Sequence, residues 1–170
     1  MCVIGESRRS RTTMSSAEAL SLPEIRHMRS DDLDVVLAIE QASFSTPWSW
    51  ASFRNLLARA DADLWVAVVE NEVIGYAVVW YAATEGELGN LAVAPGKRCL
   101  GVGRSLLEWT LRKAKERGAE RIFLEVRISN RVAQDLYRSR GFVQVGLRRR
   151  YYRAPTEDAR VMCLDLASEV

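Results

Sequence analysis

Three short stretches in the second half of the chain contain residue types that could perform chemistry. The first is residues 98–104, of sequence RCLGVGR, in which two glycines lie between two arginines. Glycine lets a backbone approach a ligand closely, and the N–H groups at the start of a helix attract phosphate. The stretch therefore indicates a phosphate-binding loop, although such glycines could also simply tighten a structural loop. It lacks the third glycine of the dinucleotide fingerprint and the Gly-Lys-Ser/Thr end of the Walker loop.

The other two stretches offer an acid and a base. Glu125 lies in an apolar run, where strand alternation puts Phe123, Glu125 and Arg127 on one face. A carboxylate beside apolar neighbours can act as a general base, or it can be an ordinary residue of a sheet surface. Asn130 can cap a helix that contains Tyr137, whose hydroxyl could donate a proton or whose ring could pack in the core. Taken separately, these signals leave both interpretations open.

These residues must be positioned by elements that the hydrophobic pattern predicts in mixed order. A run of strands comes first and strands then alternate with helices, which indicates an α/β layer fold with a partly antiparallel sheet. Two β-rich runs around Asn71-Glu72 predict a hairpin, and Gly118 and Gly141 are expected to end two helices. The predicted strands are 24–29, 64–70, 73–82, 87–93, 122–127, 142–147 and 160–166, and the predicted helices begin at Ser30 and Ser49 and span 103–117 and 131–140.

Length and composition set the class of protein. With 170 residues, 48% of them hydrophobic and 27% charged, the chain fits one globular domain. Residues 1–22 are rich in Ser, Thr and Arg and are expected to form a flexible tail, which leaves residues 23–170 as the domain. No apolar run approaches the ~20 residues of a membrane helix, and no secretory signal is visible. Three scattered cysteines favour a reducing, cytoplasmic compartment, and with one histidine they predict no metal site.

Charge is divided unevenly along the chain. Residues 1–85 carry 7 basic and 12 acidic side chains, whereas residues 86–170 carry 17 basic and 10 acidic ones. The division suggests a cationic partner for the first half and an anionic one for the second, or it merely follows local helix faces. The arginines at 148–150 and in the tail could also suggest nucleic acid. No nucleic-acid-binding motif accompanies them, so no such partner is expected.

In their order and spacing, the three stretches resemble the GNAT acetyltransferases. Arg98-x-x-Gly101-x-Gly103 is similar to the pyrophosphate loop of that superfamily, Q/R-x-x-G-x-G/A. Further matches, between residues 24 and 166, resemble the RimI-type ribosomal-protein N-terminal acetyltransferases. They are Glu40, Phe44, Pro47-Trp48, Glu87, Asn90-Leu91-Ala92-Val93, Leu124-Glu125-Val126-Arg127, Asn130, Leu136-Tyr137, Gly141-Phe142, Arg149-Arg150-Tyr151-Tyr152 and Glu157-Asp158-Ala159. Arg150 departs from the small polar residue expected before the two tyrosines, and Leu100 departs from a polar loop residue.

The resemblance implies a GNAT fold, a single mixed β-sheet splayed at its centre and flanked by helices, with acetyl-CoA lying in the opening. It implies that Glu125 is the proton acceptor and Tyr137 the proton donor. Asn130 would also reach the cofactor, and backbone groups of Leu91, Ala92 and Val93 would hold its pantetheine arm. The expected pyrophosphate loop consists of Arg98, Cys99, Leu100, Gly101, Val102, Gly103 and Arg104.

The implied reaction is acetyl transfer to a protein α-amine by direct attack in a ternary complex. An α-amine has a pKa near ~8, so a carboxylate has only a modestly basic group to deprotonate. The implied acceptor is the N-terminal alanine of small-subunit ribosomal protein S-eighteen, and a monomeric enzyme is expected. A basic ribosomal terminus would be attracted to acidic residues of the first half and its border, namely Asp31, Asp32, Asp34, Glu40, Glu85 and Glu87.

Other functions stay open at this point. Within enzymes, the rivals are a broader peptide or lysine acetyltransferase and a small-amine acetyltransferase; Tyr151 and Tyr152 favour a peptide acceptor. A cofactor-binding regulatory module without catalysis is a different class, and the presence of both Glu125 and Tyr137 argues against it. A covalent route through Cys99 is a further alternative, but no Cys/His pair is evident.

Overall fold

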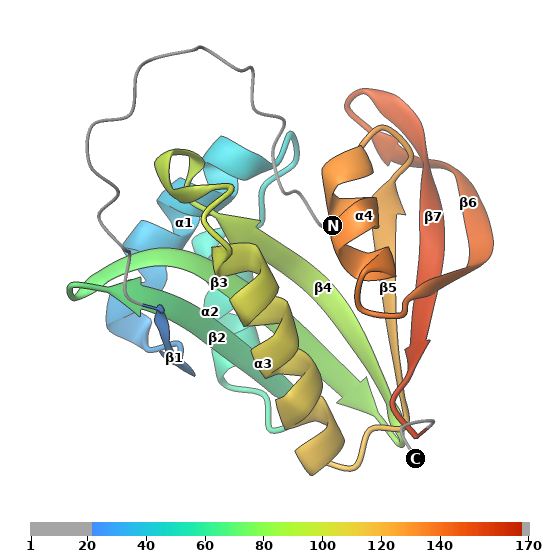
Figure 1. The fold of residues 1–170 in the computed structure, drawn as a ribbon. Coiled ribbons are helices and arrows are strands. Elements are labelled where there is room, and N and C mark those ends of the chain that lie inside the picture. Colours follow the sequence, from blue (N-terminus) through green and yellow to red (C-terminus); the bar gives the residue numbers. More distant parts are fainter. Residues whose placement is uncertain (1–21, 168–170) are drawn as a thin grey trace.

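The computed structural model describes residues 22–167, which contain one mixed sheet with the strand order β1-β2-β3-β4-β5-β7-β6. Figure 1 shows that β4 and β5 lie together at one end of the sheet and diverge toward the other, with α3 and α4 on the same side of it. The strands are β1 (Glu24–His27), β2 (Ala62–Val69), β3 (Glu72–Ala82), β4 (Glu85–Val93), β5 (Arg121–Arg127), β6 (Val143–Arg153) and β7 (Thr156–Asp165), and the helices are α1 (Leu33–Ser43), α2 (Trp50–Leu57), α3 (Val102–Glu116) and α4 (Arg131–Arg138).

The first four strands form an antiparallel meander. Between β2 and β3, Glu70 and Asn71 have φ angles of 51° and 66°, the left-handed geometry that matches the twist of a two-residue hairpin. This confirms the predicted hairpin. The next hairpin pairs Ala82 with Glu85, so β4 begins two residues before the expected position 87. The connecting Ala83 and Thr84 are not typical turn residues, which is why the pattern did not reveal that turn.

The contact between β4 and β5 is parallel and short, and it produces the opening in the sheet. Its register runs only from Glu85 opposite Arg121 to Leu88 opposite Leu124. Beyond these rungs β4 continues along β3, while β5 continues along β7. The predicted mixed, centrally splayed sheet is therefore confirmed.

Each face of the sheet has its own hydrophobic core. On the α3–α4 face, Leu106 of α3 and Tyr137 of α4 belong to the same core as alternate residues of the strands. The strand residues include Leu88, Leu91 and Leu124. On the α1–α2 face, Leu33 of α1 and Phe53 of α2 pack with the other set of alternate strand residues. That set includes Val66, Tyr76 and Val78. Because β3 is covered on both sides, its residues 73–82 read as a nearly continuous apolar run in the sequence.

The helix boundaries follow local chemistry. Ser49 caps α2 by accepting from the Ser52 N–H at 3.1 Å, and Asn130 caps α4 by accepting from the Ala133 N–H at 3.1 Å. Gly118 and Gly141, with φ angles of 90° and 87°, follow α3 and α4 as predicted. The prediction that an α-helix begins at Ser30 is wrong, because residues 30–32 form a separate 3₁₀ turn before α1.

That turn is held by a buried carboxylate. Asp32 accepts from the Arg29 N–H at 2.7 Å and forms an ion pair with Arg26 at 2.7 Å. The guanidinium of Arg26 lowers the pKa of Asp32 by hydrogen bonding to its charged form. These contacts fix the chain in a tight turn between β1 and α1.

The last hairpin is longer than the pattern predicts. The expected strands at 142–147 and 160–166 extend toward each other until only Ala154 and Pro155 connect them. Residues 148–150 are all arginines, so they show no apolar alternation, and β6 is an edge strand exposed along most of its length. Sequence patterning therefore missed half of this strand.

Within residues 22–167, no helix is long and apolar enough to cross a membrane. In the same range, no group of three or more His, Cys, Asp or Glu side chains is placed to hold a metal ion. The predicted tail at 1–22 lies outside the described residues, apart from the exposed Leu22.

Candidate active site

The opening between β4 and β5 exposes the middle of the sheet, and β4 has a bulge at this point. Val78 pairs with Asn90 and Val79 with Leu88, so Gly89 is an additional residue on β4. A Cβ atom at Gly89 would lie 2.2 Å from the ring of Trp80. Glycine at this position therefore allows the indole to lie against the strand.

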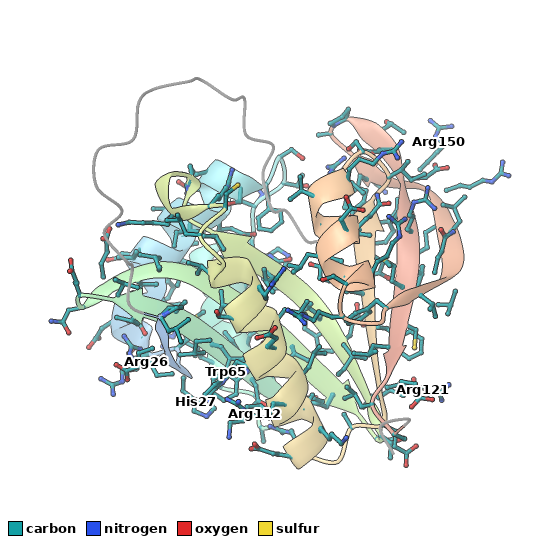
Figure 2. All side chains as sticks on the ribbon, viewed as in Figure 1. Arg26, His27, Trp65, Arg112, Arg121 and Arg150 are labelled. Atoms are coloured by element: carbon teal, nitrogen blue, oxygen red, sulfur yellow. The ribbon has the colours of Figure 1, made fainter. Side chains whose placement is uncertain are left out.

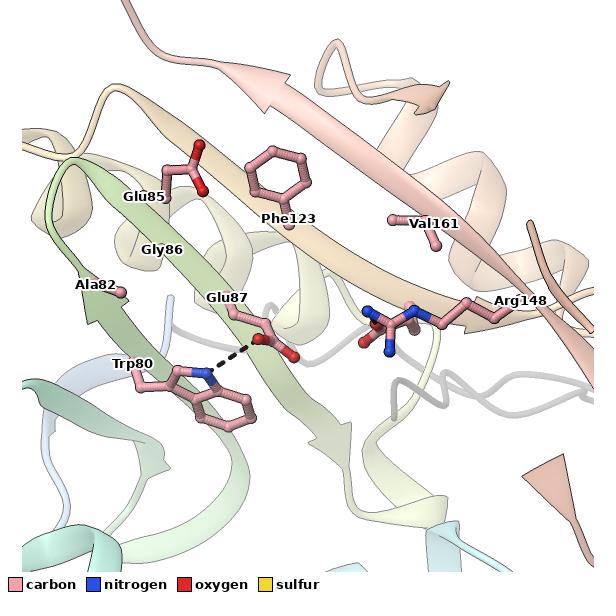
Figure 3. Close-up of a pocket in the computed structure, with 9 residues that line it drawn as sticks. Trp80, Ala82, Glu85, Gly86, Glu87, Phe123, Arg148 and Val161 are labelled. Atoms are coloured by element: carbon pink, nitrogen blue, oxygen red, sulfur yellow. Dashed lines mark hydrogen bonds and ion pairs between the residues drawn. The ribbon is translucent and has the colours of Figure 1, made fainter. Parts of the chain in front are cut away.

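A cavity of about 270 Å³ borders the opening on the α1–α2 face. Figure 3 shows Trp80 and Glu87 on one side of it, Phe123 on β5, and Arg148 reaching in from β6. Glu125 also lines the cavity and is only 7% exposed. Strand alternation thus places Phe123 and Glu125 on one face, as predicted, while Leu124 packs on the other.

The electrostatic surroundings of Glu125 suit a base. Burial raises the pKa of Glu125, the nearby Glu87 carboxylate raises it further, and Arg148 acts in the opposite direction. Arg148 Nη2 lies 3.2 Å from Glu125 Oε1. A carboxylate whose pKa is raised toward neutrality is a more effective proton acceptor near pH 7.

A second buried carboxylate holds the loop that follows α1. Glu40 is fully buried and accepts from the Trp48 N–H at 2.8 Å and from the Asn90 side-chain amide at 3.1 Å. The Tyr76 hydroxyl also donates to it. Burial raises the pKa of Glu40, whereas these hydrogen bonds lower it. The network fixes Trp48, whose ring centroid lies 6.1 Å from that of Trp80.

Arg127 joins the elements around the cavity. Its guanidinium donates to the Ser45 hydroxyl at 3.0 Å, forms an ion pair with Glu157 at 3.1 Å and lies 4.0 Å from the ring centroid of Tyr152. Since these partners come from the loop after α1 and from both strands of the last hairpin, Arg127 holds that hairpin beside the opening. The side chain is 8% exposed, so it is a structural cross-link.

The position of Arg150 explains why a small polar residue is typical there. Its φ angle is 51°, and its N–H donates to Asp158 at 2.7 Å within a break in the pairing of β6 with β7. Left-handed backbone favours Asn or Gly over a long side chain. Arg150 itself is exposed.

On the α3–α4 face, the start of α3 has the form of an anion-binding loop. Cys99 and Gly101 both have left-handed φ angles, 63° and 84°, and no side chain caps the helix. Successive backbone N–H groups in such a turn, together with the helix dipole, attract phosphate. A cavity of about 420 Å³ lies between this loop and α4, lined by Cys99, Gly101, Gly103, Arg104 and Leu136 among others.

The loop residues differ in what they can contribute. Val102 is buried in the core and Leu100 is half exposed, so the backbones of these two residues are what a phosphate would contact. The Arg98 side chain is engaged elsewhere: Nε donates to the Val93 carbonyl at 2.9 Å and Nη2 to the Ser43 hydroxyl at 3.1 Å. Desolvation lowers the pKa of Arg98. Arg98 thus ties β4 to α1 and positions the loop.

The two predicted residues of α4 lie on its inner side. Asn130 uses its side-chain oxygen to cap the helix, so its side chain is held at the start of α4. Tyr137 is fully buried and packs edge-on against Phe142 with ring centroids 5.6 Å apart. It belongs to the core of the α3–α4 face, whereas Glu125 belongs to the opposite face.

The structure thus divides the predicted site between two faces that meet at the opening. The phosphate loop, Asn130 and Tyr137 lie on the α3–α4 face, and Glu125 faces the cavity on the α1–α2 face. Sequence reasoning missed Trp80 and Arg148 and gave Glu87 no chemical part. Trp80 pairs with Glu87 in the register of β3 with β4. If the sequence had revealed the turn at Ala83, it would have predicted this register and with it the contact between the two side chains.

Two sequence expectations change with the side-chain contacts. Asp32 is paired with Arg26 and Glu40 is buried, so neither can attract a distant cationic peptide as expected. A covalent route through Cys99 finds no support from His27, because this imidazole stacks on Trp65 with ring centroids 4.0 Å apart, away from the loop (Figure 2).

Residues 31–142 match the family model described as "Acetyltransferase (GNAT) family". The fold and the two-sided site agree with that match. The chain belongs to the GNAT acetyltransferase family. It is 34% identical over 160 residues to the ribosomal protein bS18-alanine N-acetyltransferase of Escherichia coli (strain K12), with 91% of this chain and 98% of that protein covered. It is also 33% identical over 168 residues to the N-alpha-acetyltransferase of Sulfurisphaera tokodaii, with 90% of this chain and 100% of that protein covered.

The solved structures include a similar enzyme. The crystal structure of the ribosomal-protein-S18-alanine N-acetyltransferase from Escherichia coli superimposes with a TM-score of 0.80 and 30% sequence identity, covering 88% of this chain and 97% of that one. The comparison extends over both faces of the sheet, so the resemblance to the RimI-type enzymes is confirmed.

Acetyl-CoA, the acetyl donor of this family, fits the residues present. A Cβ atom at Gly101 would meet nothing within 4 Å, so the loop is open at this position. Asp135 of α4 lines the cavity beside this loop, where Arg104 offsets its charge. Two left-handed residues before a 15-residue helix supply backbone donors, and Arg104 adds positive charge. This donor set matches a pyrophosphate.

Proposed function

We propose that this protein transfers the acetyl group of acetyl-CoA to the N-terminal α-amine of a protein, by direct attack in a ternary complex. The observation that carries the proposal is the position of Glu125, a buried carboxylate in a cavity on the face opposite the phosphate loop. An amine on one face and a thioester on the other can then meet in the opening between β4 and β5.

Cofactor binding falls to the backbone of the loop at the start of α3. The N–H groups of Cys99–Arg104 hold the pyrophosphate, with Asn130 beside them. The edge of β4 at Leu91, Ala92 and Val93, beyond the last rung with β5, holds the pantetheine arm and thioester. A backbone N–H of that edge stabilises the oxyanion, a contribution that an enzyme can preorganise.

Proton movements are divided between the two faces. Glu125 accepts the proton of the α-ammonium, directly or through one water, and frees the lone pair that attacks the thioester carbon. Collapse of the tetrahedral intermediate breaks the C–S bond, and Tyr137 donates its proton to the departing thiolate. The second proton of the attacking nitrogen returns to the phenolate through water, and Glu125 releases the first proton to solvent. The α-ammonium has a pKa near ~8, and the raised pKa of Glu125 narrows the difference between the two groups, which favours this transfer.

The proposed acceptor is the alanine terminus of a basic ribosomal protein of the bS18 type. Support comes from the Escherichia coli relative, which is named for that acceptor, and from the carboxylates around the cavity. Tyr151 on β6, whose ring lies beside Arg148, adds an aromatic side chain suited to contact with a peptide. The ribosome would then be met through a protein substrate, with no nucleic-acid contact and no membrane.

The test measures CoA release with four acceptors at equal concentration. They are a basic peptide beginning with Ala, the same peptide with an acetylated terminus and no lysine, an N-acetylated peptide with internal lysines, and a small amine. Acetylation of the first alone is the expected result. Acetylation of the lysine peptide or the small amine at the same rate would favour the broader alternatives, and no CoA release with any acceptor would contradict the proposal.

A further inference from the structure

Four charged side chains line the cavity beside the opening, and only Glu125 has been given a part in the reaction. Glu85 and Glu87 come from β4, Glu125 from β5 and Arg148 from β6. Arg148 forms an ion pair with Glu125 at 3.2 Å, and Glu85 is paired with Arg121. Among the residues that the structure describes, Glu87 is therefore a carboxylate without a cationic partner, and it lies beside Glu125 and a cation that belongs to the protein itself.

Glu87 is held in place before any ligand binds. The Trp80 indole donates to Glu87 Oε2 at 3.1 Å, as Figure 3 shows. Trp80 is in turn fixed by Trp48 and by the space that Gly89 leaves for its ring. Since only one carboxylate oxygen of Glu87 receives this bond, the other can accept from a ligand.

Arg148 is held far more loosely. Its side chain is 57% exposed, and beyond Glu125 it lies 5.4 Å from the ring centroid of Tyr151. Because the guanidinium itself is exposed to solvent, it can move into water when a competing cation takes its place beside Glu125. The Glu125 side chain, in contrast, is 9% exposed and cannot leave the cavity.

We infer that Glu87 is a second acceptor-binding carboxylate, which holds the α-ammonium of the substrate next to Glu125, and that Arg148 is the internal cation which the ammonium displaces. This inference rests on the proposed function and adds the groups that select a charged amino terminus. The ammonium donates to Glu87 and to Glu125, and then loses a proton to Glu125. The acetylated product carries no charge, so Arg148 returns to Glu125 as the product leaves.

The charges around Glu125 support this arrangement. The groups that face it are Glu87 and the more distant Glu85 from β4, and Arg148 and Tyr151 from β6. Glu87 raises the pKa of Glu125 and Arg148 lowers it. Displacement of Arg148 by an ammonium thus exchanges one cation for another, and the site keeps its charge balance.

The first variant to test is Glu87→Gln, which keeps the shape of the side chain and its contact with Trp80. We expect KM for an Ala-starting peptide to rise roughly tenfold, because a charge-assisted hydrogen bond is lost, while kcat stays within about threefold. Glu116→Gln, a carboxylate on α3 outside the cavity, is the control for loss of one negative charge. Glu116 is paired with Lys113 at 2.6 Å, so KM should stay within about twofold of the wild-type value.

The second variant is Arg148→Gln, with Arg149→Gln, the next residue along β6, as its control. Removing the internal competitor should lower KM for the peptide about two- to fivefold. The two changes should also move the acidic limb of the kcat/KM profile, which reports the free enzyme, in opposite directions. That limb falls to lower pH in Glu87→Gln, which lacks the neighbouring anion, and rises to higher pH in Arg148→Gln, which lacks the cation.

The outcomes separate this inference from the proposed function. If the wild-type protein acetylates the peptide and Glu87→Gln has an unchanged KM, the inference is wrong and the function stands. If Arg148→Gln raises KM, Arg148 binds the substrate and is not displaced by it, which also overturns the inference. If the wild-type protein releases no CoA with any peptide, both fall together. Thermal melting of each variant distinguishes these results from loss of the fold.

Discussion

Replacing Glu40 with alanine should destabilise the protein more than any change on its surface. This carboxylate is fully buried between α1, β3 and β4, where three different groups donate to it. They are the Trp48 N–H, the Tyr76 hydroxyl and the Asn90 amide. Alanine removes the shared acceptor and leaves the donors in an apolar core.

The magnitude follows from the number of bonds lost. A buried donor deprived of its partner costs about 1–3 kcal/mol, and relaxation of the loop lets some of these groups reach water. Taking about 1–1.5 kcal/mol for each of the three donors, we expect the free energy of unfolding to fall by about 3–4 kcal/mol. Tyr76→Phe removes one donor and keeps the acceptor, so its loss should be about 1 kcal/mol.

Urea denaturation at pH 7 measures these differences. Peptide kinetics on the folded Glu40→Ala protein provide a second readout. Because Glu40 fixes Trp48 behind Trp80, KM for the peptide should rise while affinity for acetyl-CoA stays near the wild-type value. A loss below about 1 kcal/mol in Glu40→Ala would refute the reasoning, since it would mean that the three donors find other partners at little cost.

The pH dependence of stability gives an independent check. Burial raises the pKa of Glu40 in the folded protein. The folded state therefore binds this proton more tightly than the unfolded state, and the resulting stability is fully present below the unfolded pKa and lost as pH rises through the folded one. Compared with Glu40→Gln, which cannot titrate, the wild-type protein should gain relative stability on acidification. A difference in stability that does not vary with pH would contradict the assignment.

Three further predictions concern catalysis and binding. Glu125→Gln should lower kcat about 10²–10⁴-fold while the affinity for acetyl-CoA is preserved. Tyr137→Phe keeps the ring packed on Phe142 and should also lower kcat. Nearly full single-turnover rates in both variants would rule out the proposed proton transfers. Gly101→Val places a β-branched side chain at a φ angle of 84°, so the dissociation constant of acetyl-CoA should rise about tenfold or more when measured by calorimetry. An unchanged dissociation constant would mean that the loop does not bind phosphate. A peptide with Ala at its N-terminus and arginines after it should be acetylated faster at low salt than a peptide with acidic residues in place of the arginines. This difference in rate should shrink as the salt concentration rises, and equal rates at low salt would remove the electrostatic argument.

The sequence was informative where chemistry depends on short local patterns. The glycines at 101 and 103, the cap at Asn130 and the alternation around Glu125 all follow from neighbouring residues, and the elements that carry them were predicted within a few positions. The opening of the sheet, in contrast, depends on where the pairing of β4 with β5 stops, and no local pattern marks Leu88 as the last rung. It followed only from family resemblance.

Side-chain contacts across elements were the least predictable part. The position of Arg98 in its loop suggests a phosphate ligand. Its side chain instead donates to the Val93 carbonyl at the end of β4 and to the hydroxyl of Ser43, which is distant in sequence. Arg148 reads as part of a basic run, and its contact with Glu125 exists only because β7 alone separates β6 from β5 in the sheet, so that the Arg148 side chain can reach across it. Such pairings depend on sheet order, which hydrophobic periodicity does not contain.

The short junction between β4 and β5 also bears on how the products of the proposed reaction would leave. With donor and acceptor on opposite faces, CoA would leave from the α3–α4 face and the acetylated terminus from the α1–α2 face. Turnover would then require no fixed order of release. An acetylated peptide would be free to leave while CoA is still held, so slow departure of the nucleotide would not keep the product on the enzyme.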